Sequence, residues 1–503
     1  MKNKVQSVLE SGSEALIIDV ECALSNSLPN IIIVGLGSKS IDEAKERIRN
    51  AFVASRIKLP RKKITINMAP SDIPKEGSSY DLPMSLAILK ASDMIKVRLP
   101  EKTIIMGELG LDGEVKAIRG IIGKIIAAKR LGYKNFIIPR GNANQARIIP
   151  EVFIWEVSNL RTLYELLNDN SPLPFIKSEA NSNIAEGDLP KEQSVTLDDI
   201  IDQDQAKRAM VIAGAGHHNL LLNGPPGSGK SMLAKAFVNI LPGLTKNEAL
   251  EITHLHSLVS KNYETIITRR PVRSPHHSSS HISLIGGGQH PKPGEISLSH
   301  HGVLFLDELP EFDKRVIEAL RQPLEDKEIT VARVKDSVVF PAKFILIATA
   351  NPCPCGYWGS QKECSCLPHN IIRYQQKISG PILDRIDLYV GVTEVKHSRL
   401  LEDSAVSKRD WRKIISDARE IQLKRSGKLN NELSNKDVKK YCKLDDQTQD
   451  FFNSAAQKLI LSARSYMKIL KVARTIADID SSENIELSHL TEALQYRKKD
   501  AIL

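Results

Sequence analysis

The stretch "LLLNGPPGSGKSMLAKAF", residues 220–237, decides the fold of its part of the chain. A short apolar run meets a loop of glycines and prolines, and a helix-like pattern follows it. The loop fits the pattern G-x-x-x-x-G-K-[ST] with Gly224, Pro225, Pro226, Gly227, Ser228, Gly229, Lys230 and Ser231. In such a loop, backbone N–H groups face the phosphates, the lysine reaches the β- and γ-phosphates, and the serine hydroxyl holds Mg²⁺. The strand before it and the helix after it argue against a chance glycine turn and predict a site for a nucleoside triphosphate such as ATP.

Two further apolar runs end in polar side chains. The first, "GVLFLDELPEF" (302–312), delivers Asp307 and Glu308, and the second, "KFILIATANP" (343–352), delivers Asn351. Ligands of open α/β sheets sit at the carboxyl ends of the strands. We expect Asp307 to bind Mg²⁺, Glu308 to polarise the attacking water, and Asn351 to orient that water and the γ-phosphate.

Composition and charge narrow the class of protein. The chain has 503 residues, enough for several domains, and 41% of them are hydrophobic, as in ordinary globular proteins. No apolar run approaches the roughly 20 residues of a membrane span, and the first residues do not resemble a signal peptide. We therefore expect a cytoplasmic protein with no membrane partner. The net charge of +10 is compatible with a nucleic-acid partner.

The pattern of expected helices and strands divides the chain into two α/β parts and a helical C-terminal part. Expected strands at 30–35, 63–70, 103–111 and 135–139 alternate with expected helices at 40–55 and 121–132, which predicts an α/β domain over residues 1–168. Residues 169–195 are polar and without periodicity, as in a linker. A second α/β pattern, the core that holds the phosphate loop, covers 196–400, and residues 401–503 read as helices only.

The order of these motifs resembles that of AAA+ ATPases, and two long stretches are more specific. Residues 269–312 and 315–356 are similar to the Mg-chelatase/ComM (YifB) branch, and the resemblance covers nearly the whole chain. It implies a P-loop α/β core followed by an all-helical lid, in hexameric motors of which ComM is a DNA branch-migration helicase of natural transformation. A motor that remodels a protein or inserts a metal, as a chelatase subunit does, is the alternative. Asp202-Gln203 stands where the family usually has Gly-Gln, which affects local loop geometry.

Two arginines are candidates for contacts with the γ-phosphate. Arg385, in "SGPILDRIDLYVGV", is placed as an arginine finger that would enter the nucleotide site of a neighbouring subunit. A surface ion pair with Asp384 or Asp387 is the simpler interpretation of Arg385. From the helical lid we expect Arg464 to reach the γ-phosphate, with Arg474 as its competitor.

The segment "EITVARVKDSVVFPA" (328–342) alternates apolar and polar residues around a turn, as a β-hairpin does. In a ring of subunits such a hairpin would point into the pore, where Arg333 and Lys335 would meet DNA phosphates without reading sequence. The resemblance also implies an insertion within 255–300 that includes Gly286-Gly287-Gly288. An ordinary exposed hairpin is the alternative.

Four cysteines, Cys353, Cys355, Cys364 and Cys366, form two C-x-C pairs separated by eight residues. Folded back on each other, these pairs present four thiolates tetrahedrally, which suits structural Zn²⁺. His369 is an alternative ligand, and reduced free thiols or a redox role are alternatives to metal. Cys22 and Cys442 are expected to be isolated and buried. Histidines crowd residues 254–301, and we interpret His276, His277 and His281 as polar loop contacts in preference to a metal site.

Residues 73–89 and 107–139 look like the Lon protease domain. Lon-type catalysis needs a serine activated by a lysine amine beside it. Ser79 falls at the serine position, but the lysine position falls on Ile122, which cannot accept a proton. Lys124 lies two residues further along a helix, so it would point elsewhere. We therefore expect no peptidase activity, and a Ser79–Lys124 pair remains the alternative.

Overall fold

The computed structural model describes residues 4–498 apart from 12–13, 36–38, 72, 74, 76, 170, 179–194, 261–263, 289–290, 333–336 and 395–408. The chain divides into two compact units. The first comprises residues 1–185 and 245–268, and the second comprises 186–244 and 269–503. No helix among the described residues combines the length and the apolar character needed to cross a bilayer.

The first unit is built on an eight-stranded mixed sheet of order β10-β9-β8-β5-β1-β2-β4-β3. Its sheet strands are β1 (Lys4–Ser11), β2 (Glu14–Ser25), β3 (Asn30–Val34), β4 (Lys63–Ala69), β5 (Thr103–Ile105), β8 (Asn135–Pro139), β9 (Phe153–Val157) and β10 (Ile176–Lys177). A small hairpin pairs β6 (Glu108–Leu109) with β7 (Val115–Lys116). The helices are α1 (Lys39–Ala54), α2 (Asp81–Ala91), α3 (Ile121–Arg130), α4 (Ala143–Arg147), α5 (Leu160–Leu166) and α8 (Lys246–Ser257).

Two details of the first unit differ from the expectations. The run expected as one strand over 103–111 is two, β5 and β6, with Gly107 between them. A Cβ on Gly107 would meet Val115 Cγ1 at 2.9 Å, so the chain turns there without a side chain. The segment expected as a linker from residue 169 supplies edge strand β10, which pairs with β9. Its Phe175 packs edge-on against Trp155, with ring centroids 5.6 Å apart.

Residues 245–268 interrupt the second part of the chain but pack with the first. Leu250 of α8 is 5% exposed and belongs to the apolar cluster formed by Ile121, Ile125 and Ala128 of α3. A capping box at Thr245 starts α8, because the Thr245 and Glu248 side chains exchange hydrogen bonds with each other's backbone N–H groups.

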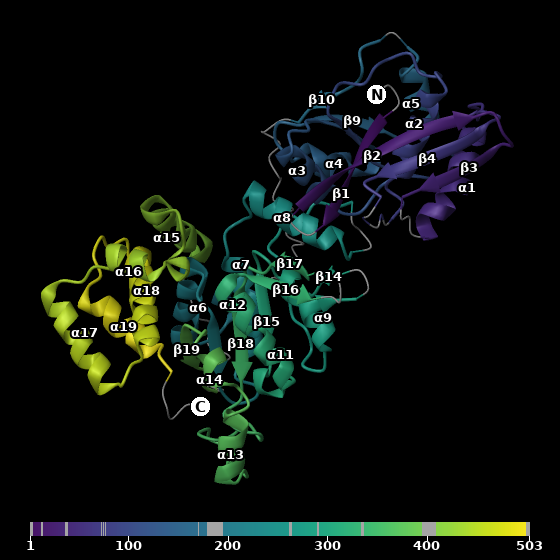
Figure 1. The fold of residues 1–503 in the computed structure, drawn as a ribbon. Coiled ribbons are helices and arrows are strands. Elements are labelled where there is room, and N and C mark those ends of the chain that lie inside the picture. Colours follow the sequence, from purple (N-terminus) through teal and green to yellow (C-terminus); the bar gives the residue numbers. More distant parts are fainter. Residues whose placement is uncertain are drawn as a thin grey trace. The chain divides into compact units, whose positions relative to one another are not determined.

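The second unit contains a five-stranded parallel sheet of order β12-β15-β18-β11-β19 (Figure 1). Its strands are β12 (Val272–Arg273), β15 (Val303–Leu306), β18 (Ile345–Ala350), β11 (Leu220–Asn223) and β19 (Leu388–Gly391). The helices of this core are α6 (Asp204–Gly216), α7 (Lys230–Ile240), α9 (His281–Ile285), α10 (Glu295–Leu298), α11 (Lys314–Ala319), α12 (Arg321–Asp326), α13 (Pro368–Gln375) and α14 (Gly380–Leu383). In α7, Leu233, Phe237 and Ile240 recur at helical spacing and are buried in the core.

Two hairpins extend from this core. The expected hairpin at 328–342 is present as β16 (Glu328–Ala332) and β17 (Ser337–Pro341), which pair antiparallel. Its turn, with Arg333 and Lys335, lies outside the described residues. The glycine-rich segment forms a second hairpin of β13 (Gly286–Gly287) and β14 (Lys292–Pro293). A Cβ on Gly286 would meet the Lys292 carbonyl oxygen at 2.4 Å, which is why that position has no side chain.

The C-terminal part is helical, as expected, and its helices gather in one bundle (Figure 1). They are α15 (Trp411–Ser426), α16 (Asn435–Tyr441), α17 (Asp446–Lys458), α18 (Ala463–Ile479) and α19 (Leu487–Gln495). A buried carboxylate, Asp478, organises their polar contacts. It accepts hydrogen bonds from Arg425 at 2.6 and 2.7 Å and from Asn430 Nδ2 at 2.8 Å. A sheet core and a helical lid thus form the second unit, and the fold class predicted from the sequence is confirmed.

The packing of α8 yields a test of how the chain is divided. Leu250→Ala removes a buried side chain from the first unit and should cost that unit about 2–5 kcal/mol. Hydrogen-exchange mass spectrometry should then show faster exchange in α3 and α4, with α7 unchanged.

Leu233→Ala in α7 is the matched control, because it should speed exchange around the phosphate loop and leave α3 as it is. If Leu250→Ala leaves exchange in α3 unchanged, residues 245–268 do not belong to the first unit.

Candidate active site

The ends of three neighbouring parallel strands form the candidate site. Asn223 at the end of β11 pairs in register with Ala350 at the end of β18, and Leu306 of β15 pairs with Ala348. The residues that follow these strands therefore meet at one edge of the sheet. They are the phosphate loop, Asp307-Glu308 and Asn351.

The phosphate loop has the backbone geometry that its glycines permit. Gly227 and Gly229 have φ values of 78° and 88°, a region that side chains disfavour. A Cβ on Gly224 would meet the Val392 carbonyl oxygen at 2.1 Å, so the loop starts in close contact with the chain after β19. Ser228 Oγ donates a hydrogen bond to the Pro225 carbonyl oxygen at 2.9 Å and closes the turn.

Lys230 begins α7 and its amine lies inside the loop. Lys230 Nζ donates to the carbonyl oxygens of Gly224 and Pro225 at 2.7 and 2.8 Å, and to Asn351 Oδ1 at 3.3 Å. Burial lowers the pKa of Lys230, an effect partly opposed by the nearby carboxylates of Asp307 and Glu308. The structure thus brings the lysine and the asparagine predicted from two different strand ends into direct contact.

The hydroxyl of Ser231 and the carboxylate of Asp307 also meet. Ser231 Oγ donates to Asp307 Oδ2 at 3.1 Å. Hydroxyl and carboxylate oxygens are the ligands that Mg²⁺ prefers, so these two side chains fit the ion that the motif predicts. Glu308 follows in the left-handed region, with φ of 53°, and its side chain is exposed.

Thr349 is a site residue that the sequence analysis did not single out. Its hydroxyl donates to Asp307 Oδ1 at 2.6 Å and accepts from the Glu308 backbone N–H at 2.8 Å, and the residue is fully buried. Thr349 therefore holds both acidic residues in position. The available signal was a threonine near the end of an otherwise apolar strand, because a polar group buried on a sheet needs a partner.

The two candidate arginines lie together on the second unit. Arg385 forms an ion pair with Glu325 and donates to the Pro381 carbonyl oxygen at 2.7 Å. Arg464 NH2 lies 3.9 Å from the other oxygen of Glu325. None of these contacts involves the phosphate loop or the three strand ends. The structure therefore pairs Arg385 with Glu325, and not with Asp384 or Asp387 as the simpler interpretation expected.

Arg474, the alternative to Arg464, is buried and forms its hydrogen bonds within the helical lid. It is 3% exposed, lies one helical turn from Asp478, and donates to the carbonyl oxygens of Ser482 and Glu483 at 2.6 and 2.8 Å. Arg464, in contrast, is 46% exposed. Between these two arginines, Arg464 is the one available to a ligand or a partner.

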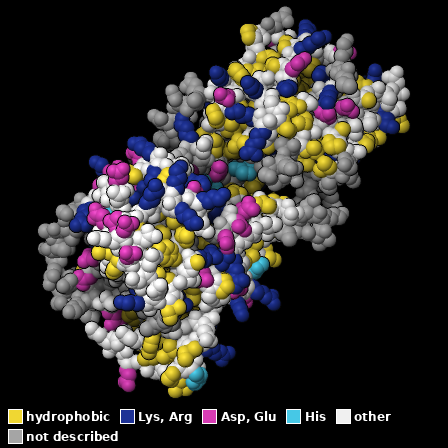
Figure 2. All heavy atoms as spheres, turned by 60° about the vertical axis from the view of Figure 1, so that its left-hand side comes forward, with side chains coloured by type: hydrophobic (Ala, Val, Ile, Leu, Met, Phe, Trp, Pro, Cys, Tyr) yellow, Lys and Arg dark blue, Asp and Glu magenta, His cyan; other side chains and the backbone are white. Residues whose placement is uncertain are grey.

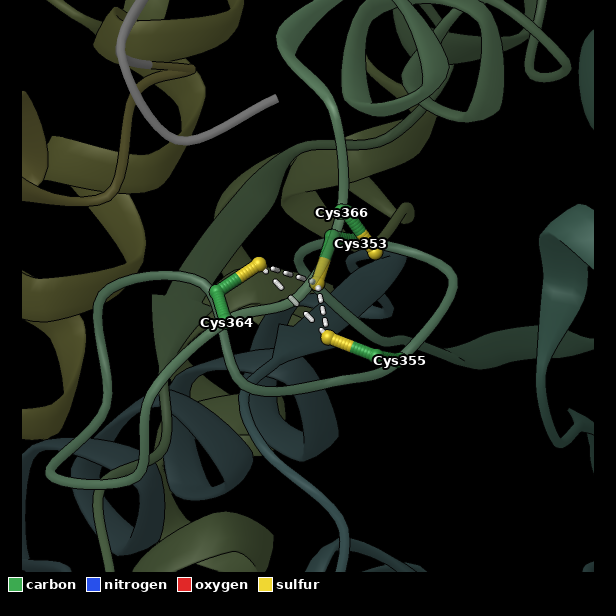
Figure 3. Close-up of side chains that lie close together, drawn as sticks. All are labelled: Cys353, Cys355, Cys364 and Cys366. Carbon is green, nitrogen blue, oxygen red and sulfur yellow. Dashed lines mark hydrogen bonds between the residues drawn. The ribbon is translucent and has the colours of Figure 1, made fainter.

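The four clustered cysteines converge on one point (Figure 3). Cys353 Sγ lies 3.3 Å from Cys355 Sγ and 3.7 Å from Cys364 Sγ, and Cys366 completes the group. A tetrahedral ion with Zn–S bonds of about 2.3 Å would separate its sulfurs by roughly 3.8 Å. A hydrogen bond from the Tyr357 backbone lowers the pKa of Cys355 to about 6, while hydrogen bonds with the neighbouring thiols raise the pKa of Cys364 and Cys366, so the support for a metal is the convergence of the four sulfurs. The donor set therefore fits a metal such as Zn²⁺.

The other candidate ligands do not join a cluster. His369 is exposed and lies outside the cysteine group. The rings of His276 and His277 are 4.1 Å apart, but these two and His281 do not form a metal-ligand set within the described part of the chain. Cys22 and Cys442 are buried free thiols, as expected.

In the first unit, the residues compared with Lon do not form the required pair. Ile122 is fully buried in the apolar cluster of α3. Lys124 Nζ donates to the Arg119 carbonyl oxygen at 3.1 Å. Ser79 is 6% exposed at the start of α2. The position of the Lon lysine is therefore part of the core.

The parallel sheet order, the phosphate loop, the acidic strand end and the helical lid define an AAA+ P-loop ATPase. The comparisons identify its family. The profile described as "Magnesium chelatase, subunit ChlI" matches residues 196–400, "Subunit ChlI of Mg-chelatase" matches 20–142, and "Magnesium chelatase, subunit ChlI C-terminal" matches 405–497. The chain belongs to the ComM/YifB family of Mg-chelatase-like AAA+ proteins, and this membership implies ATP hydrolysis.

Its relatives cover nearly the whole chain. Competence protein ComM of Haemophilus influenzae is 41% identical over 98% of this chain and 97% of its own length. YifB of Escherichia coli K12 is 39% identical over 98% of this chain and 96% of its own length. Lon protease of Leptospira interrogans is 28% identical over 33% of this chain, a similarity that concerns the N-terminal part.

The contacts of Thr349 predict its effect on hydrolysis. Thr349→Val keeps the shape but removes the hydrogen bonds to Asp307 and to the Glu308 backbone. Because these bonds orient both acidic residues, we expect kcat for ATP hydrolysis to fall at least tenfold while ATP affinity changes less than threefold. Steady-state ATPase kinetics and calorimetric titration with ATP measure the two quantities.

Thr491→Val, on the exposed side of α19, is the control and should leave both quantities unchanged. A Thr349→Val variant with the kcat of the unsubstituted chain would contradict the role assigned to Thr349.

Proposed function

We propose that this protein is a homo-hexameric, ATP-driven DNA translocase of the branch-migration type. The observation that carries the proposal is the meeting of the phosphate loop, Asp307-Glu308 and Asn351 at one sheet edge, together with similarity to Competence protein ComM over 98% of the chain. The family resemblance implies this activity and a part in natural transformation. The AAA+ fold of the second unit and the residues gathered at its sheet edge support the proposal.

In this proposal, each step of ATP hydrolysis would have its own residue in the candidate site. Lys230 would bind the β- and γ-phosphates, and Ser231 and Asp307 would hold the Mg²⁺ that neutralises phosphate charge. Glu308, with its exposed carboxylate, would polarise the attacking water, and Asn351, already bonded to Lys230, would orient it. The backbone of residues 224–229 would cradle the phosphates.

Ring assembly would complete the site. Arg385 and Arg464 share Glu325 on one subunit, so both would face the same neighbour. In the assembled ring, the γ-phosphate of that neighbour would take the place of Glu325 as the partner of Arg385. Loss of the γ-phosphate on hydrolysis would release Arg385 and shift the lid against the core.

Basic groups would grip the DNA backbone. The β16–β17 hairpin would line the pore with Arg333 and Lys335 at its turn. On the face that Figure 2 shows, Lys and Arg side chains lie over both units and are interspersed with acidic ones.

The remaining elements would have structural roles. The first unit would organise the ring or contact DNA and would have no peptidase activity, since Ile122 leaves Ser79 without the lysine of Lon. The cysteine cluster would hold Zn²⁺ and stiffen the loop between Asn351 and Arg385. A structural site of four thiolates has no open position for a substrate, so the metal would not take part in hydrolysis.

A chelatase-like ATPase that remodels a protein or drives metal insertion is the second candidate. The matches of three ChlI profiles to residues 20–142, 196–400 and 405–497 favour it. Both candidates use the same ATPase residues, so DNA dependence separates them.

The decisive measurement is the ATPase rate with and without single-stranded and four-way-junction DNA, on protein whose oligomeric state is measured by light scattering. We expect hexamers with ATP and at least a fivefold stimulation by DNA. Glu308→Gln should bind ATP and stall, because the water is no longer polarised. Lys230→Ala should lose nucleotide binding.

ATP hydrolysis that is indifferent to DNA would favour the chelatase-like alternative. Normal hydrolysis by Glu308→Gln would show that the catalytic base is misassigned.

The metal content of the cysteine loop is a separate prediction. The purified chain should contain a single zinc ion, measured by mass spectrometry of the acid-digested protein. Cys364→Ser should lower the zinc content at least threefold and lower the thermal midpoint, because the loop loses its cross-link.

Cys22→Ser, which removes a cysteine from the first unit, controls for thiol loss and should leave the zinc content unchanged. Full zinc content in Cys364→Ser would exclude the cysteine cluster as the metal site.

A further inference from the structure

The lid helix α18 carries a line of polar side chains that joins the lid to the core of the second unit. The four members are spaced four, three and four residues apart, which places them on one face of a helix. In chain order they are Arg464, Lys468, Lys471 and Thr475. Arg464 lies near Glu325 of α12, and the hydroxyl of Thr475 lies 2.8 Å from His218 Nε2. This face of α18 therefore contacts the core near both of its ends.

Lys468 reaches the segment that carries Arg385. Its Nζ donates a hydrogen bond to the Ile386 carbonyl oxygen at 2.7 Å, and Ile386 directly follows Arg385 in the chain. A hydrogen bond from an ammonium group is about twice as strong as one between neutral groups. The lid thus holds the backbone one residue away from the candidate arginine finger.

The core holds the same backbone through Asn219, which is buried and comes directly before β11. Asn219 Nδ2 donates to the Arg385 carbonyl oxygen at 3.0 Å, and the Asn219 backbone N–H donates to Asp387 Oδ2 at 2.9 Å. Asn219 Oδ1 accepts a hydrogen bond from the Leu346 backbone N–H of β18 at 3.0 Å. Because β11 and β18 are paired in the sheet, this attachment belongs to the core, whereas the attachment through Lys468 belongs to the lid.

The surroundings of Lys468 explain why a lysine occupies this position. Burial lowers the pKa of its amine, an effect that the carboxylates of Asp387 and Asp384 oppose. The ammonium group therefore balances acidic side chains that lie on either side of Arg385 in the sequence. An apolar residue at position 468 would remove this balance together with the hydrogen bond.

Arg385 has a donor that its own subunit leaves unsatisfied. Its guanidinium contacts Glu325 and the Pro381 carbonyl oxygen, but its buried Nε has no hydrogen-bond partner within the described part of the chain. A buried donor without a partner costs free energy. A shift of the backbone that brings Arg385 to an acceptor on a neighbouring subunit would therefore be favoured.

We propose that Lys468 is a positioning residue for Arg385, because a movement of α18 displaces the Arg385 backbone through the bond to the Ile386 carbonyl. This inference rests on the proposed role of Arg385 at the nucleotide site of a neighbouring subunit. Arg464 lies one helical turn before Lys468 and shares Glu325 with Arg385, so the same movement would reach both arginines. The lid of one subunit would then set the rate of hydrolysis at the next.

The test uses mixed rings of two full-length subunits. One subunit carries Arg385→Ala and keeps its own nucleotide site, and the other carries Glu308→Gln and can supply only Arg385. Because an arginine finger is worth roughly a thousandfold or more in kcat, mixing should raise ATP turnover about fivefold or more above the sum of the separate proteins.

The second step adds Lys468→Met to the Glu308→Gln subunit. Met keeps the length of the side chain but removes the donor and the charge, so most of the gain on mixing should disappear. Lys468→Arg, which keeps a charged donor, should recover it. An affinity tag on one subunit, with recovery of both, shows that mixed rings have formed.

Lys471→Met in the Glu308→Gln subunit is the matched control. Lys471 lies on the same face of α18, and burial lowers its pKa as well. Its Nζ, however, donates to the Asn431 carbonyl oxygen at 3.0 Å, which is a bond within the lid. Lys471→Met should therefore leave the gain on mixing unchanged, and the thermal midpoints of the two Met variants should be similar.

Hydrogen-exchange mass spectrometry tests the contact independently of the ring. Lys468→Met should speed amide exchange over residues 381–387, because the lid no longer holds this backbone, and Lys471→Met should not. This measurement decides the question if a substituted subunit does not enter mixed rings.

Three results would overturn the inference. The first is a full gain on mixing with the Glu308→Gln/Lys468→Met subunit, and the second is unchanged exchange over 381–387 in Lys468→Met. The third is an equal loss of the gain with Lys468→Met and Lys471→Met, which would mean that any substitution on this face weakens the lid. If the Glu308→Gln subunit itself gave no gain, the proposed role of Arg385 would fail and the inference with it, so the two failures are distinguishable.

Discussion

The parallel pairing of β11, β15 and β18 is the constraint on which the rest of the second unit depends. Because the three strands run in the same direction, their carboxyl ends meet at one edge, and residues far apart in the chain become neighbours there. Three hydrogen bonds then join them: Lys230 to Asn351, Ser231 to Asp307, and Thr349 to Asp307. A strand in the opposite direction would carry its polar end to the other edge and leave the phosphate loop without its partners.

The elements around this edge pack against it through close contacts at glycines, which leave no room for a side chain. Gly224 packs against the Val392 carbonyl, and Gly356 packs against Pro226. The cysteine loop and the chain after β19 thereby line a cavity of about 600 Å³ next to the phosphate loop. In the lid, Asp478 binds Arg425, Arg474 and Asn430, which leaves Arg464 outside the buried network. The same packing that stabilises the lid therefore selects which arginine is exposed.

Because residues 245–268 belong to the first unit, the chain runs from the phosphate-loop region into the first unit and then back into the second. The helix that begins at Lys230 ends at Ile240, and residues 245–268 then join the core of the first unit. The chain returns directly before β12, the strand that pairs with β15. In the sequence, residues 245–268 thus lie between α7, which starts in the phosphate loop, and β12, which lies beside the strand that precedes Asp307.

The sequence by itself determined the class of each part and predicted the residues of the candidate site. The phosphate loop, Asp307-Glu308, Asn351 and the four cysteines are local patterns whose residue types and spacings already imply their ligands. Patterns of residues that are close together in the sequence depend on local backbone geometry, so they can be recognised before the tertiary structure is known. Only the tertiary structure decided that Thr349 holds both acidic residues and that Glu325 joins Arg385 to Arg464. It also decided that residues 245–268 pack with the first unit and that Trp358 lines the cavity next to the phosphate loop. Each of these depends on contacts between residues distant in the chain, and the packing that creates such contacts leaves no periodic trace in the sequence.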